Sequence, residues 1–197
     1  MIFLGTVRQW HWISSAVCLV GMLLFAITGI TLNHAAQITV KPRIDTIERQ
    51  LPEDILSAIT QPDADKAPLS QPLAQWLEQE LDIVVGTRSA EWSEEEIYLS
   101  LPRPGGDAWL TVDLVEGAVF FEKTDRGWIS YFNDLHKGRN TGTVWFWFID
   151  IFAVACVVFC ISGLILLYRY AGGRPTTWPL VGLGLVIPTI LALLFIH

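Results

Sequence analysis

The chain has 197 residues, of which 52% are hydrophobic and 17% are charged. That balance is typical of a membrane protein with one modest water-soluble part. The formal net charge of −7 argues against nucleic acid as a partner, because phosphate binding requires clustered cations. The three cysteines all lie in apolar runs, so they predict no disulfide framework and do not indicate the redox compartment.

Three apolar stretches are long enough to cross a bilayer, which takes about 20 residues. They lie within residues 1–34, 144–170 and 171–197, the last after a short loop. A cleaved signal peptide is the competing interpretation of the first stretch. Its apolar region is too long and the cleavage site after it is weak, which favours an uncleaved anchor. Trp and Tyr near the ends of the first two stretches match the aromatic belts of membrane interfaces.

Residues 35–143 are polar and predict a small α+β domain inserted between the first and second spans. Apolar residues at helical spacing predict two short helices early in this domain, at 44–51 and 55–59. Residues 61–69 are expected to form a loop. Ser70 is expected to cap a longer helix in which leucines recur one turn apart.

Beyond that helix the apolar period changes to two, which is typical of half-buried strands. Alternation around residues 97–101, 109–113 and 119–121 predicts an antiparallel meander of three or four strands. The intervening residues at 93–95, 104–107 and 116–117 have the composition of turns. The expected fold class is therefore membrane α-helical, with three transmembrane helices and an inserted small α+β domain.

Orientation follows from the charges that flank the spans. If all three stretches span, Arg8, Arg169 and Arg174 lie on one side, and the positive-inside rule makes that side cytoplasmic. The N-terminus would then be inside. The polar domain would lie in the periplasm, attached to the inner membrane of a bacterium.

Small residues recur on one face of each of the first two spans: Ser14, Cys18, Gly21 and Thr28 in the first, and Cys156, Cys160 and Gly163 in the second. We interpret them as a device for close helix packing in lipid. A thiol site at the paired cysteines is disfavoured, because lipid disfavours a thiolate. Asp150 lies just inside an apolar run, where an ionisable group normally has a partner or a role. It would either accept hydrogen bonds near the headgroups or serve a cofactor site.

All four histidines lie at ends of spans: His11, His34, His136 and His197. Neutral imidazole ligates haem iron without burying a charge. His34 closes the first span and His136 precedes the second, so adjacent antiparallel spans would bring the two together on the outer side as axial ligands. His136 reaches that depth only if the chain turns at the nearby glycines or if the second helix extends beyond the bilayer. The competing interpretation is that interfacial histidines are amphipathic anchors.

His11 lies 23 residues before His34, about 34 Å along a helix, and so belongs to the opposite leaflet. It has no partner within the chain on that side, and a homodimer would be needed to supply one. His197 is a further candidate on the outer side. Near His136, the cations Lys137 and Arg139 would pair with haem propionates.

Trp145 and Trp147 would pack on the haem ring.

The chain has no Rossmann glycine fingerprint, no CxxCH motif and no Walker loop. Electrons would therefore come from a partner protein or from the quinone pool.

Two stretches carry a family resemblance: WHWISSAVCLVGMLLFAITGITLNH and, after the polar domain, DLHKGRNTGTVWFWFIDIFAVACVVFCISGLILL. Together they resemble the PepSY-associated transmembrane family, and the domain between them looks like a PepSY-type domain. Some larger relatives are haem reductases of the inner membrane that act on iron–siderophore complexes. The resemblance implicates His34, His136 and also His11 as haem ligands. This chain departs from those relatives in having three spans rather than four or more.

Two functions of different classes follow. The first is a haem b electron-transfer protein that passes electrons to a periplasmic acceptor, such as a ferric chelate or a flavoprotein. The second is a non-catalytic, membrane-anchored PepSY module that binds a periplasmic partner protein through its exposed strands. No catalytic residue is assigned under either hypothesis.

Overall fold

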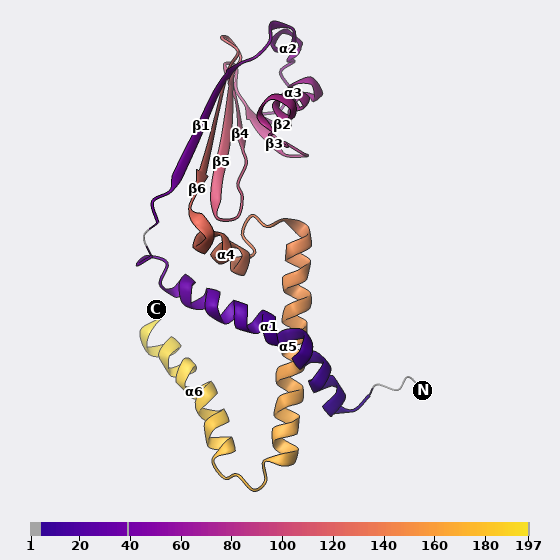
Figure 1. Ribbon diagram of the computed structural model, residues 1–197, viewed down its shortest axis with the longest axis vertical. Helices are drawn as coiled ribbons and strands as arrows, with labels where there is room; N and C mark the ends of the chain where they lie inside the picture. The colour runs from indigo at the N-terminus through magenta and orange to yellow at the C-terminus, as the bar shows by residue number, and fades with distance from the viewer. Residues whose placement is uncertain (1–4, 39, 197) are drawn as a thin grey trace. The chain divides into compact units, whose positions relative to one another are not determined.

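A computed structural model describes residues 5–38 and 40–196 (Figure 1). Residues 26–146 form one compact unit, and the remaining residues form the other. We call the first the domain unit and the second the membrane unit.

Three helices are long and apolar enough to cross a membrane, which confirms the three expected spans. They are α1 (Val7–Asn33), α5 (Gly142–Tyr170) and α6 (Thr177–Phe195). At most 11% of the most apolar window of each helix is buried within the protein. Such apolar exposure is stable in lipid, where the surroundings are as apolar as the side chains.

In the membrane unit, α1 and α5 pack against each other in antiparallel directions. His11 stacks on Phe159, and further along α1 the small Gly21 faces Phe152. A Cβ atom added to Gly21 would overlap the ring of Phe152, so any larger residue there requires that ring to move. This close approach confirms the role expected of Gly21 in helix packing.

The cysteines divide between two environments. Cys18 is fully buried, with the Cys156 thiol within hydrogen-bonding range, and both are free thiols. Cys160 is exposed. The packing role is therefore confirmed for Cys18 and wrong for Cys160, which turns away from the contact face of α5.

The domain unit contains a six-stranded antiparallel sheet in the order β1-β6-β5-β4-β3-β2. Its strands are β1 (Arg43–Gln50), β2 (Lys66–Pro68), β3 (Ser89–Trp92), β4 (Glu96–Ser100), β5 (Gly106–Asp113) and β6 (Ala118–Asp125). Its short helices are α2 (Glu53–Ala58), α3 (Gln71–Leu81) and α4 (Gly127–Lys137). The meander β3–β6 and the helix before it confirm the expected α+β domain.

Helix α3 covers one face of the sheet (Figure 1). Leu73 and Leu77 of α3 are fully buried against alternate strand residues such as Leu99 and Leu110. The other face carries an aromatic ladder, in which the Trp109 ring lies 6.2 Å from Tyr98 and 5.1 Å from Phe120. Helix α3 thus buries one face of the sheet and leaves the other face uncovered.

The sequence-based prediction is wrong at both edges of the sheet. Residues 44–51 are expected to be helical, but most of them form β1, in which Ile47 pairs with Phe121 of β6. Pairing with a complete neighbouring strand outweighs a helical spacing of only three apolar residues. The expected loop at 61–69 contains β2, which pairs with β3.

The chain enters and leaves the sheet at one end of the β1–β6 pair, where Arg43 pairs with Asp125. Asp125 accepts hydrogen bonds from the backbone N–H of Gly127 at 2.7 Å and from Arg103 at 3.1 Å. These contacts lower the pKa of the Asp125 carboxyl, the Gly127 bond most of all. They fix the start of α4 directly after β6.

Replacing Gly21 by Ala should destabilise the α1–α5 contact by about 1–3 kcal/mol, because Phe152 must move to admit the methyl group. Gly182→Ala in α6 is the matched control, since a Cβ there meets nothing within 4 Å. Thermal unfolding in detergent, followed by circular dichroism, measures both. Equal midpoints for the two variants would contradict the contact.

Candidate functional site

His136 is anchored on α1 by its ring. Its Nδ1 atom lies 2.6 Å from the hydroxyl oxygen of Thr28, and a Cβ added to Gly29 would lie 3.8 Å from its Cε1 atom. This position is reached because α4 ends at Gly138, which has a left-handed conformation, and the chain turns before α5 begins. From the sequence, His136 is expected to reach this depth either through a turn at the nearby glycines or through a second helix that extends beyond the bilayer. The structure has the turn.

A second bond accompanies the first. The hydroxyl of Thr31 donates to Oδ1 of Asn133 at 2.6 Å. Thr28 and Thr31 are three residues apart on α1, as are Asn133 and His136 on α4, so both pairs lie on single helix faces. These contacts hold α4 antiparallel to the last turns of α1.

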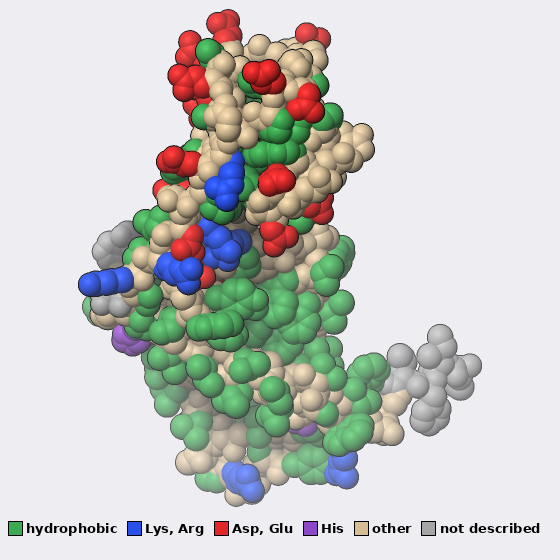
Figure 2. Space-filling model, turned by 45° about the horizontal axis from the view of Figure 1, so that its top comes forward, with side chains coloured by type: hydrophobic (Ala, Val, Ile, Leu, Met, Phe, Trp, Pro, Cys, Tyr) green, Lys and Arg blue, Asp and Glu red, His purple; other side chains and the backbone are tan. Residues whose placement is uncertain are grey.

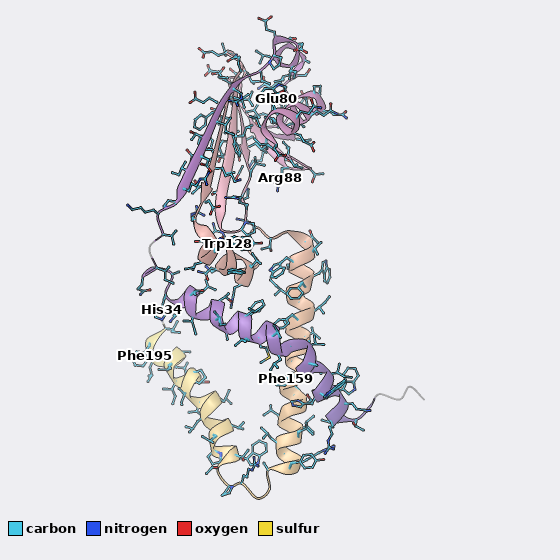
Figure 3. All side chains as sticks on the ribbon, viewed as in Figure 1. His34, Glu80, Arg88, Trp128, Phe159 and Phe195 are labelled. Carbon is cyan, nitrogen blue, oxygen red and sulfur yellow. The ribbon has the colours of Figure 1, made fainter. Side chains whose placement is uncertain are left out.

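His34 lies at the end of α1 and is exposed (Figure 3). It follows Thr28 by six residues, which places it about 9 Å further along the helix and about 120° around it. Its side chain therefore leaves α1 on a different face from the one that receives His136. The described contacts do not bring the two imidazoles together, so the expected pairing of His34 with His136 around one iron does not fit this geometry.

His11 is anchored on α5 in the membrane unit. Its Nδ1 atom lies 3.1 Å from the Ser162 hydroxyl and 3.3 Å from the carbonyl oxygen of Phe159. The Ser162 hydroxyl itself donates to the Phe159 carbonyl at 3.0 Å. A carbonyl oxygen can only accept, so the tautomer that satisfies the contact with Phe159 is the one with its proton on Nδ1. The Nε2 atom is left with its lone pair and has no hydrogen bond to any described residue.

The His11 ring lines a groove with a volume of about 450 Å³. The other residues that line it are Gly163, Leu166, Leu167, Tyr170, Ala171 and Arg174. Most of the lining residues are apolar, and the one cation among them, Arg174, lies in the loop after α5. The Tyr170 hydroxyl accepts a hydrogen bond from Arg8 at 3.4 Å, which adds a second cation near the groove.

The two anchored histidines share one construction, which we call the imidazole seat. Each ring binds a hydroxyl through Nδ1 and lies against the glycine that follows: Thr28-Gly29 for His136, and Ser162-Gly163 for His11. From the sequence, Thr28 and Gly163 are interpreted as packing residues, and both dipeptides belong to the stretches that carry the family resemblance, but neither is predicted to hold a histidine. The signal that could have found them is the hydroxyl–glycine dipeptide, which occurs once in each of the two long spans at these positions.

The remaining predicted residues are scattered. Lys137 and Arg139 are exposed beside His136, and Asp150 is exposed on α5. The Trp145 indole donates to the carbonyl of Leu135 at 2.9 Å, which closes the corner between α4 and α5.

Trp147 is 59% exposed. His197 lies outside the described residues. Among the described residues no cluster of three or more His, Cys, Asp or Glu side chains could hold a metal ion.

The family model described as PepSY_TM-like matches residues 2–197, which is nearly the whole chain. The chain belongs to this family. No curated protein and no solved structure matches it. The match covers all three spans of this PepSY_TM-like protein and its inserted domain. The roles of its histidines rest on the geometry described above.

Replacing Thr28 by Val in this PepSY_TM-like protein removes the hydroxyl at constant shape. We expect a loss of about 1–3 kcal/mol of stability, because the half-buried Nδ1 atom of His136 loses that partner. Thr28→Ser keeps the hydroxyl and should retain most of that stability. Thr189→Val is the control, since the Thr189 hydroxyl bonds only to its own helix at Leu185. Unfolding midpoints in detergent report the difference, and a Thr28→Val variant as stable as the parent would contradict the seat.

Proposed function

We propose that this protein binds haem b and transfers electrons through the membrane region, with His11 as an axial ligand. The two contacts of the His11 Nδ1 atom carry the proposal. A ligand histidine normally gives its second ring N–H to a carbonyl or a similar acceptor, which fixes the tautomer and raises the basicity of the ligating nitrogen. The Phe159 carbonyl and the Ser162 hydroxyl take that part here.

The groove beside His11 suits a flat apolar ring with acidic groups at its edge. Phe159 stacks on the imidazole at 4.9 Å and limits its rotation. Gly163 admits the ring edge, because a Cβ at that position would lie 3.2 Å from Cε1 of His11. Arg174 lines the same groove and would pair with a propionate. Bound there, haem would accept and release single electrons.

The groove offers one histidine, so the second axial ligand would come from a second copy of the chain. Buried ligands on two copies would make haem binding and dimer formation interdependent. His136, held in the same kind of seat, is the candidate ligand of a second haem. Lys137 and Arg139 follow it in sequence. The acceptor would then be a ferric chelate or a flavoprotein on the side of the soluble domain.

A haem titration of variants tests the proposal. Membranes that contain the parent chain should show a Soret band and a reduced-minus-oxidised spectrum of haem b. His11→Ala should lose at least half of the haem per chain, and Ser162→Ala should weaken haem binding by about 10–100-fold. His34→Ala is the matched control and should retain the parent content.

Loss of haem in His34→Ala with full retention in His11→Ala would overturn the assignment of the ligand. A parent chain that takes up no haem after supplementation would overturn the function itself.

The second candidate function is a membrane-anchored module that binds a partner protein. The observation in its favour is the uncovered sheet face, on which Tyr98 is 39% exposed beside Trp109 and Phe120. Under this function, replacing His11 and His136 by Ala leaves partner binding intact. Replacing Tyr98 and Trp109 by Ser abolishes it. The two sets of variants therefore separate the two functions.

A further inference from the structure

Helix α4 buries polar side chains and exposes apolar ones, which is the reverse of the usual arrangement for a helix on a soluble domain. Its polar residues Asn133 and Asp134 are buried, at 8% and 9% exposure, while Trp128 is 76% and Phe132 is 49% exposed. Figure 3 labels Trp128 on this helix. Ile129 and Tyr131 belong to the same exposed set. We call these four residues the α4 aromatic face. In water, such a face would leave a contiguous apolar patch uncovered.

Three hydrogen bonds fix which face of α4 turns outward. Asn133 accepts from Thr31, His136 bonds Thr28, and Oδ2 of Asp134 accepts the Gly105 backbone N–H at 2.8 Å. Gly105 has a φ of +72°, and a Cβ there would lie 2.7 Å from the Tyr131 backbone, so the turn and the helix are in tight contact. Turning the aromatic face inward would break all three bonds. The outward face is therefore a fixed feature of the fold.

The same bonds set the level of α4 along the membrane normal. Thr28 and Thr31 belong to the last turns of the span α1, and the next span, α5, begins five residues after α4 ends (142 − 137). A helix bound at that height lies where spans leave the hydrocarbon. Trp and Tyr concentrate at this depth in membrane proteins.

Cations of the domain unit also lie beside α4. Arg126, Lys137 and Arg139 flank α4 and form no ion pair with any described residue. Arg43 and Arg103 lie at the same end of the sheet, where they pair with Asp45 and Asp125. Figure 2 shows Lys and Arg side chains in the lower part of the soluble domain, with acidic side chains beside them and above. The three cations beside α4 that form no ion pair match an anionic headgroup layer.

We propose that α4 is an interfacial helix that lies in the lipid surface on the side of the soluble domain. The α4 aromatic face enters the boundary between headgroups and acyl chains, and the flanking cations meet anionic headgroups. The occupant of this face is therefore lipid. The domain is held against the bilayer by this contact as well as by the two spans. This inference is independent of haem.

Spin labels on the full-length protein test it, in bilayers of phosphatidylethanolamine and phosphatidylglycerol. A nitroxide is attached at Trp128→Cys and, in a second variant, at Phe132→Cys. The control is Val115→Cys, because Val115 is 73% exposed on the β5–β6 turn. The labelled parent, with its three native cysteines, supplies the background. Power saturation compares collisions with oxygen, which partitions into lipid, and with a water-soluble nickel chelate.

At residues 128 and 132 we expect oxygen collisions to exceed nickel collisions several-fold, and at residue 115 the reverse. Removing phosphatidylglycerol should shift the two α4 sites toward the control. Nickel access at 128 and 132 equal to that at 115 would overturn the proposal, because the face would then lie in water. Protection from both reagents would also overturn it, because the face would then be covered by protein.

Discussion

The imidazole seat is the contact on which the rest of this structure depends. In lipid no hydrophobic force drives helices together, so association relies on close approach and on hydrogen bonds. A histidine ring that binds a hydroxyl and lies against a glycine supplies both at one point. His11 ties α1 to α5 in this way, and His136 ties α4 to α1. The same two contacts hold α1 in register with α5 and with α4.

At His11, the packing contact and the proposed ligation use different nitrogens of the ring. At His11, the Phe159 carbonyl and the Ser162 hydroxyl contact Nδ1, and the ring lines the groove. A histidine that only stabilised helix packing would gain nothing from lining that groove. This separation of roles within one ring is the reason that the haem function is preferred to a purely structural role for His11.

The spans, the helix α3 and the meander could be predicted from the sequence, because apolar length and period-two alternation are local signals. The edge strand β1 could not, since Ile44 and Ile47 also satisfy a helical spacing and only the pairing with β6 decides between the two. The histidine contacts could not be predicted for a related reason. His34 and His136 are both at span ends in sequence, but the turn at Gly138 lays α4 back along α1 and brings His136 to Thr28 instead.

The position of Arg43 opposite Asp125 has a mechanical consequence. The two chain segments that tether the soluble domain leave β1 and β6 at the same end of their pairing. Any movement that draws the first span away from α4 would thus pull the two strands apart one residue pair at a time, beginning at Arg43 and Asp125. A pair loaded in shear would resist with all of its bonds together. Tension between the tethers would therefore peel β1 from the edge of the sheet first and leave the helix-covered core of the domain intact.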